Sequence, residues 1–187
     1  MNRRFLRLFA PFLGLTALTA LACNFGGLTA PPTPTPIPSP TLTPPPTEYA
    51  VPDEGRFHIE VGTAADYAHF PPSSGSHYGQ IPDWGFYRDP VPPEYFVHNL
   101  EHGGIVILYN CPTACPDSEK VFVTLLNSAP AETTFNEVKI LVSPNAKIDS
   151  PVIALAWGWE LDLPQTDLDL LLGFYNRHVN QGPELAP

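Results

Sequence analysis

The sequence predicts one α+β domain, in which a small mixed sheet packs with two helices behind a loop-rich front that carries histidines. The second half of the chain alternates short apolar runs with helix-periodic segments, in the order strand, helix, strand, strand, helix. Residues 63–93 are instead rich in proline, glycine, serine and aspartate, which is typical of loops. Residues 53–187 are of the length that one domain with a single core uses.

The first half of this domain predicts little regular structure. Residues 57–61 alternate in polarity and predict a short strand, and a loop as long as the one that follows is commonly functional. Residues 94–102 predict about two helical turns, begun by the prolines before them and ended by Gly103 and Gly104. The alternative for these glycines is a backbone nest for an anion. The apolar run at 105–109 predicts a central strand covered on both faces.

The second half predicts the two helices and the rest of the sheet. Apolar residues at helical spacing predict an amphipathic helix over 117–128 with a polar cap. Residues 138–142 and 152–161 predict one strand each. The last helix is predicted over 166–179, with Thr166 as its cap.

The first 52 residues predict an anchor and a tether. Residues 1–22 have a basic start and an apolar run that is short for a membrane span. Small residues before Cys23 resemble a bacterial lipoprotein signal, which predicts cleavage there and lipid on that thiol; an ordinary signal peptide or an uncleaved anchor is the alternative. Residues 23–52 are rich in proline and threonine and predict an extended tether without helix or strand. The expected location is the extracytoplasmic face of a membrane.

The charge of the chain limits the classes of partner that it can bind, and its cysteines predict a disulfide. Without the signal segment, the chain keeps six basic residues against nineteen acidic ones. So acidic a domain is a poor binder of nucleic acid and is compatible with cation binding. Outside the cytoplasm, Cys111 and Cys115 are expected to form a disulfide that closes a small loop. No protein partner can be named from the sequence.

Histidines are the residues of most chemical interest. His98 and His102 are four positions apart, which places both imidazoles on one helix face within reach of one metal ion. Glu101 between them is a further ligand or a group that orients an imidazole. The order His-x-x-Glu-His also occurs in inverted zincin peptidases, although in a longer helix. The structural alternative is that these histidines only make hydrogen bonds.

Several motifs match a known family. In order they are His58-Ile59, Tyr67, the segment 71–78, Trp84-Gly85-Phe86-Tyr87, the segment 97–104, Ala156-Trp157-Gly158 and Pro183-Glu184. Through them the chain resembles the bacterial family called domain of unknown function 3105 (DUF3105), from about residue 58 to residue 184. The resemblance implies that His58, His77, His98 and His102 occupy motif positions, and it implies a site rather than a reaction. His69 and His178 lie outside the motifs, and Ser76 stands where the family usually has proline.

A second, partial resemblance covers residues 105–126. An apolar strand, Cys-Pro-Thr-Ala-Cys-Pro and a helix are similar to the copper-site turn of Sco-type copper chaperones, which have a thioredoxin-like fold. The Gly-Gly before the strand and the longer DUF3105 match argue for coincidence. Because Met1 is the only methionine and would leave with the signal, a methionine-liganded copper site is excluded. Imidazoles with one carboxylate suit zinc, copper(II), nickel or iron(II), with zinc and copper favoured.

We therefore expect a membrane-tethered extracytoplasmic domain that binds a divalent transition metal through His58, His77, His98 and His102, with Glu101 as ligand or orienting group. A metal-dependent hydrolase or oxidoreductase is the first alternative, with no catalytic residue assigned. A structural or ligand-binding surface module without metal is the second. Aromatic residues near the histidines are expected in the core, or else as a ligand platform of that module: Trp84, Phe86, Tyr87, Tyr95 and Phe96.

Overall fold

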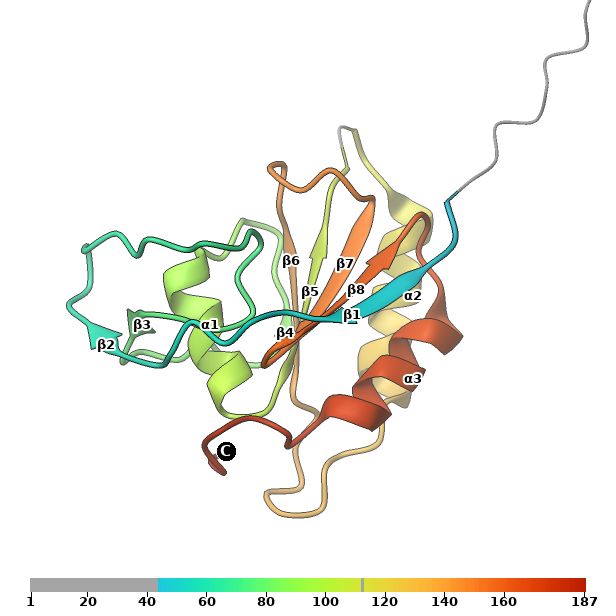
Figure 1. Ribbon diagram of the computed structural model, residues 1–187. Helices are drawn as coiled ribbons and strands as arrows, with labels where there is room; N and C mark the ends of the chain where they lie inside the picture. The colour runs from blue at the N-terminus through green and yellow to red at the C-terminus, as the bar shows by residue number, and fades with distance from the viewer. Residues whose placement is uncertain (1–43, 112) are drawn as a thin grey trace, which may run out of the picture. The chain divides into compact units, whose positions relative to one another are not determined.

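Strand β5 (Ile105–Tyr109) lies at the centre of the structure, and all five of its residues are buried. The computed structural model describes residues 44–111 and 113–187 (Figure 1). β5 pairs in parallel with β6 (Ile140–Pro144) and antiparallel with β7 (Val152–Ala156). A continuous apolar run therefore became a doubly paired interior strand, because only such a strand loses no backbone hydrogen bond on burial.

The sheet extends from β5 in both directions. Across the described residues it has six strands, in the order β1-β8-β7-β5-β6-β4. The outer strands are β8 (Trp159–Leu163), β1 (Thr47–Ala50) and β4 (Gly85–Phe86). Two further short strands, β2 (His58–Ile59) and β3 (His77–Tyr78), form a separate parallel pair in the front. With three helices in the described residues, this confirms the predicted α+β class.

Helices cover both faces of the sheet. Figure 1 shows α1 (Pro93–Glu101) on one side, and α2 (Pro116–Ser128) and α3 (Leu168–His178) on the other. Side chains of a strand alternate between faces. Val106 therefore packs in one core cluster with Leu100 of α1, whereas Ile107 packs in the other with Phe122 of α2 and Phe174 of α3. The predicted double covering of this strand is confirmed.

Two expectations about strands are wrong. The tether was expected to lack regular structure up to residue 52, but Thr47–Ala50 pairs antiparallel with β8 as the edge strand β1. The proline-rich composition gave no sign of this strand, which forms because its backbone groups hydrogen-bond to the open edge of the sheet. Residues 152–161 were expected as one strand and instead form the β7–β8 hairpin. Gly158 at its turn has φ of 71°, a conformation that side chains disfavour. The predicted signal and most of the predicted tether lie outside the described residues.

The last helix begins later than its predicted cap. Asp167 is the capping residue, and its carboxylate accepts a hydrogen bond of 3.0 Å from the backbone N–H of Leu170. Thr166 instead donates its hydroxyl to Ser118 of α2, which joins the two helices. Both residues have the chemistry of a cap, so the local sequence alone does not decide between them.

The end of α1 is fixed by the C-terminal segment, residues 180–187. Gly103 has φ of 76° and ends the helix, as predicted, and its N–H donates to the carbonyl of Leu100 rather than being free for an anion. A Cβ at Gly103 would lie 2.6 Å from the Cα of Asn180, so only glycine permits this approach. Asn180 N–H donates to the carbonyl of Gly103, and Glu184 N–H donates to that of Glu101. The segment therefore lies against the end of the helix that carries the histidine pair.

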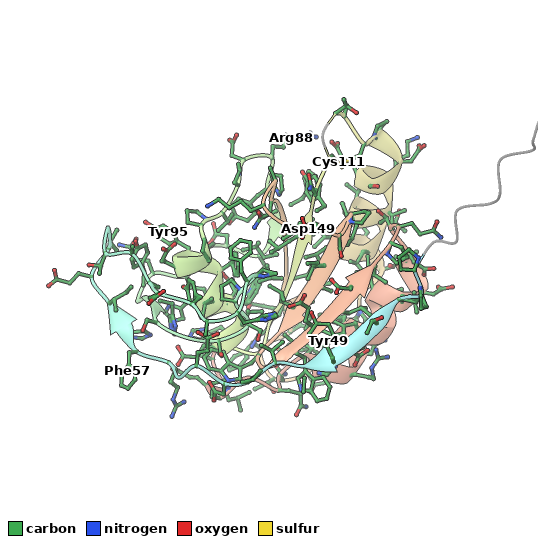
Figure 2. All side chains as sticks on the ribbon, turned by 45° about the horizontal axis from the view of Figure 1, so that its top comes forward. Tyr49, Phe57, Arg88, Tyr95, Cys111 and Asp149 are labelled. Carbon is green, nitrogen blue, oxygen red and sulfur yellow. A yellow bond between two sulfur atoms is a disulfide. The ribbon has the colours of Figure 1, made fainter. Side chains whose placement is uncertain are left out.

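Away from this front, the expected disulfide is present. Cys111 and Cys115 are bonded at 2.08 Å in the connection between β5 and α2, where Figure 2 labels Cys111. Neither sulfur is a free thiolate, which removes the main chemical support for the copper-chaperone resemblance. Among residues 44–111 and 113–187, no helix has both the length and the apolar character needed to cross a membrane.

Candidate metal centre

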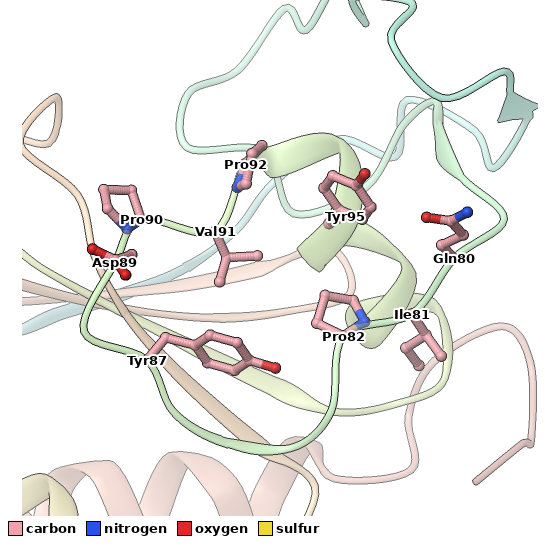
Figure 3. A pocket seen from close by; sticks show the side chains of 9 residues that line it. All are labelled: Gln80, Ile81, Pro82, Tyr87, Asp89, Pro90, Val91, Pro92 and Tyr95. Carbon is pink, nitrogen blue, oxygen red and sulfur yellow. The ribbon is translucent and has the colours of Figure 1, made fainter.

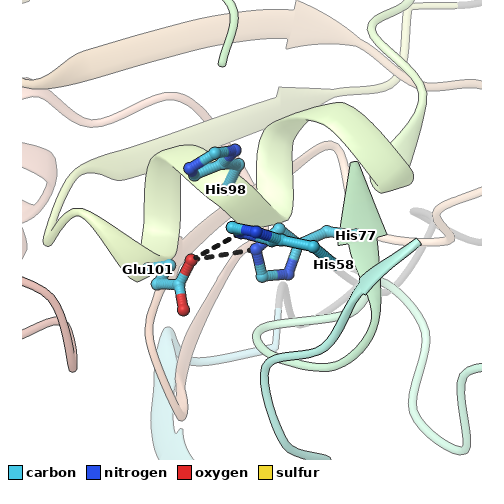
Figure 4. A group of neighbouring side chains, drawn as sticks. All are labelled: His58, His77, His98 and Glu101. Atoms are coloured by element: carbon cyan, nitrogen blue, oxygen red, sulfur yellow. Dashed lines mark hydrogen bonds and ion pairs between the residues drawn. The ribbon is translucent and has the colours of Figure 1, made fainter. Parts of the chain in front are cut away.

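The short β2–β3 ladder and the end of α1 bring distant histidines together. In the ladder His58 and His77 are direct partners across two parallel strands, so their side chains lie on the same face. His98 and Glu101 are three positions apart on α1 and therefore share one face of the helix. Figure 4 shows these four side chains converging between the ladder and the helix.

The three imidazole rings of this group form a compact triangle. Ring centroids lie 4.8 Å apart for His58 and His77, 5.0 Å for His58 and His98, and 5.1 Å for His77 and His98. One ligand atom from each histidine and one from Glu101 all lie within 4.8 Å of one another. We call His58, His77, His98 and Glu101 the front cluster. This arrangement could hold a metal ion.

Hydrogen bonds fix which nitrogen is available in two of the three rings. The Nδ1 atom of His77 lies 2.8 Å from the carbonyl of Gly75, and that of His98 lies 2.9 Å from the carbonyl of Tyr78. A carbonyl oxygen only accepts, so each Nδ1 must carry the proton that it donates. In the neutral ring the Nε2 atom is then left with a free lone pair. This pattern is typical of histidines that ligate metal through Nε2.

Inside the cluster, acceptor atoms face one another at close range. The Nε2 atom of His77 lies 2.9 Å from Oε2 of Glu101, and that of His58 lies 3.4 Å from the same oxygen (Figure 4). Two facing lone pairs repel unless a proton or a cation lies between them. Ligand atoms on one ion at bond lengths of 2.0–2.1 Å are separated by roughly 2.9–3.4 Å, depending on geometry. The observed separations fall in that range.

Burial strengthens the repulsion between facing lone pairs. His77 is fully buried and Glu101 is 3% exposed, so water cannot screen the facing atoms. Burial also lowers the pKa of His98; the hydrogen bond that its Nδ1 donates to the Tyr78 carbonyl raises it, and the neighbouring imidazoles of His102, His77 and His58 lower it again. An extra proton on His98 is therefore disfavoured at neutral pH. Only His58, whose side chain is 52% exposed, opens the cluster to solvent.

His102 lies beside the front cluster rather than within it. Its Nε2 atom is 3.1 Å from that of His98, and its Nδ1 donates to the backbone oxygen of Pro187 at 2.8 Å. A second group with ligand atoms within 4.8 Å of one another comprises Glu101, His102 and Glu184. Glu101 belongs to both groups. The helical spacing that suggested His98 and His102 as a pair therefore underestimated Glu101, which lies between the two groups.

The other two described histidines lie elsewhere, each beside its own carboxylate. His69 Nε2 lies 2.6 Å from Oε2 of Glu160, and His178 Nε2 lies 3.0 Å from Oε1 of Glu48. Neither residue has a ligand atom in the two groups. Glu184 was not predicted as a site residue, although the Pro183-Glu184 motif that carried the family resemblance contains it.

The aromatic residues near the cluster are mainly structural. Phe96 is fully buried, and Trp84 and Tyr87 pack against the core beneath α1. Tyr87 and Tyr95 do line an open, mostly apolar hollow of about 380 Å³ (Figure 3). Its remaining lining residues are Gln80, Ile81, Pro82, Asp89, Pro90, Val91 and Pro92. No histidine lines it, so the hollow and the front cluster are separate features.

Fold and site together define an α+β domain with a buried histidine and glutamate cluster that could hold a metal ion. The family model described as "Protein of unknown function (DUF3105)" matches residues 58–187. The chain therefore belongs to the DUF3105 family. No curated protein and no solved structure gives a significant match.

Proposed function

We propose that this protein is a metal-binding module in which His58, His77 and His98 ligate a divalent transition metal through Nε2 and Glu101 ligates it through Oε2. The observation that carries the proposal is the convergence of three imidazole rings and one carboxylate in a largely buried space. Two of the three Nδ1 atoms are committed to backbone carbonyls. A cation among the remaining lone pairs removes the repulsion between every facing pair at once.

The donor set indicates which metals are favoured. Three imidazole nitrogens and one carboxylate oxygen suit zinc or copper(II), and also nickel or iron(II). Cys111 and Cys115 are not expected to be ligands, because their sulfurs are joined in a disulfide and neither is a thiolate. Zinc is the first ion to test, since four ligands of this kind complete a tetrahedral shell.

A peptidase of the inverted zincin kind is a weaker candidate. In that mechanism the glutamate acts as a general base while the two histidines of the motif hold the metal. Here the Glu101 carboxylate lies 2.9 Å from the His77 ring, within the candidate ligand set, and α1 ends at this residue. A small molecule could reach the ion from the exposed side of His58. Ligand exchange or hydrolysis at the ion is therefore compatible with this site.

The cellular setting is part of the proposal. The small residues before Cys23 and the proline-rich segment after it support a lipid-anchored module on the extracytoplasmic face of a membrane. The disulfide supports an oxidising compartment. Cys23→Ser is expected to release the protein from the membrane fraction; a mutant that stays bound with its signal uncleaved, and a wild type without lipid, would show a helical anchor instead.

Isothermal titration of zinc into the full-length protein in detergent tests the metal site. Glu101→Gln removes the only carboxylate of the front cluster while preserving its shape, and we expect affinity to fall by roughly a hundredfold. Glu137→Gln is the matched control, because no side-chain hydrogen bond to Glu137 exists among the described residues. Absence of binding by wild type to zinc, copper(II), nickel and iron(II) would contradict the proposal.

A further inference from the structure

Beside the front cluster lies a second set of metal-ligand side chains that the proposed ion does not use. Ligand atoms of Glu101, His102 and Glu184 lie within 4.8 Å of one another. We infer that these three residues hold a second divalent ion, and that Glu101 bridges it to the first. The inference rests on the proposed function, because the bridging carboxylate is a ligand of the first ion.

Glu101 has a free oxygen for this role. Both imidazoles that approach its carboxylate, His58 and His77, do so at Oε2. Among the described residues, no hydrogen bond or ion pair involves Oε1. Oε1 is not among the buried polar atoms that lack a partner, so it is open to solvent and free to take a second ligand. A cation bound at Oε1 would be joined to the first ion through the Glu101 carboxylate.

His102 is oriented for the second position. Its Nδ1 donates to the backbone oxygen of Pro187, so its neutral ring has the Nε2 lone pair free. This lone pair lies 3.1 Å from the Nε2 atom of His98. Such a close approach of two acceptors is relieved when each nitrogen ligates its own ion, with the ions about 3.5–4 Å apart as in known two-metal sites.

Glu184 reaches the site because the C-terminal segment is held against the helix end. Its backbone N–H donates to the carbonyl of Glu101 at 3.1 Å. Two residues earlier, a Cβ at Gly182 would lie 2.3 Å from the same oxygen, so glycine is what allows the chain to pass. Lys139 holds the segment from the other side, donating to the carbonyls of His102 and Ala186.

The Glu184 carboxylate is exposed and unpaired near the buried carboxylate of Glu101. Among the described residues, no hydrogen bond or ion pair reaches its side chain, although one of its oxygens lies within 4.8 Å of a Glu101 oxygen. A cation between the two carboxylates would offset their repulsion. Two carboxylates and one imidazole form a harder ligand set than that of the front cluster, suited to zinc, manganese(II) or iron(II).

Metal content per chain tests this inference. The full-length protein is equilibrated with zinc, washed, and analysed by mass spectrometry, and a manganese(II)-loaded sample is examined by electron paramagnetic resonance. We expect two zinc ions in wild type, one in Glu184→Gln and two in the control Glu137→Gln. The manganese sample should show an exchange-coupled pair that becomes an isolated ion in Glu184→Gln. Because Glu184 is exposed, the substitution leaves the core intact.

The outcomes separate the two proposals. One ion in wild type, retained with unchanged affinity by Glu184→Gln, overturns the second position and leaves the front cluster standing. Two ions in both proteins also overturn it, since the second ion then lies elsewhere. No ion in wild type under either metal overturns the second position, and it overturns the front cluster as well when copper(II), nickel and iron(II) also fail to bind.

Discussion

The β1–β8 edge of the sheet and the front cluster both place histidines beside glutamates, but in different ratios. At the edge, His69 has Glu160 and His178 has Glu48, so each imidazole has a carboxylate of its own. In the front cluster, His58 and His77 share one oxygen of Glu101, and no carboxylate of the described residues lies within hydrogen-bond distance of His98. A histidine with its own glutamate is satisfied by one proton. Several imidazoles around one carboxylate are satisfied by a cation.

The largest expected effect comes from removing a ligand of the front cluster. His77→Ala should weaken zinc binding by roughly a hundredfold or more, because it removes a buried ligand and leaves an open position. His69→Ala, the matched change at the sheet edge, should leave affinity unchanged. Isothermal titration of both variants measures the difference.

His58→Ala is a second test, needed because loss of the buried His77 side chain could itself cause misfolding. The His58 side chain is 52% exposed, so its loss should weaken binding without disturbing the core. Equal affinities for wild type, His58→Ala and His77→Ala would show that the two regions do not differ, and that the front histidines are structural.

Acid should release the metal. Protons compete for imidazole nitrogens whose free pKa is about 6.5, so two such ligands lose roughly seventyfold in affinity between pH 7 and pH 5.5. The metal-free protein should weaken in the same direction. Burial lowers the pKa of His98 below that of the unfolded chain, so the unfolded state binds more protons as pH falls below 6.5. Zinc titrations and thermal melts at several pH values check both effects; affinity independent of pH would contradict imidazole ligation.

His102→Ala is expected to have a smaller effect on the first ion than His77→Ala. His102 lies outside the front cluster, with its Nε2 atom 3.1 Å from that of His98. A tenfold loss at the tighter site is therefore expected, together with loss of the second ion. Titration heats fitted to two classes of site separate these effects, and an unaltered titration would remove His102 from the site.

Sheet-edge pairs should contribute to stability alone. Burial raises the pKa of Glu48, but hydrogen bonds from His178 and Arg177 outweigh it and hold the pKa below its ordinary value. Glu48→Gln weakens these partly exposed contacts, so we expect a melting temperature lower by about 2–4 °C. Zinc affinity should be unchanged, and any loss of affinity would show that the two regions are coupled.

The sheet was largely predictable because its signals are local. Burial on both faces requires an uninterrupted apolar run, and 105–109 has one. β1 was missed because it is only four residues long and follows a proline-rich stretch, so it shows no recognisable alternation of polar and apolar residues. The β7–β8 turn was missed because Trp157-Gly158 continues an apolar run, and only the positive φ at Gly158 reveals the reversal.

The candidate site was predictable only in part. Spacing on a helix linked His98 to His102, and the family motifs added His58 and His77. No local signal shows that His58 and His77 pair across two-residue strands, because that register depends on the loop between them. Glu184 was also out of reach, since its position follows from hydrogen bonds between the C-terminal segment and α1.

X-ray absorption at the zinc edge tests the central claim most directly, because it counts the atoms around the ion. We predict nitrogen and oxygen neighbours at about 2.0–2.1 Å, with outer-shell scattering from imidazole rings that decreases in His58→Ala and is unchanged in His69→Ala. A sulfur neighbour near 2.3 Å, or a spectrum that is the same in wild type and His58→Ala, would contradict a metal centre built from the front cluster.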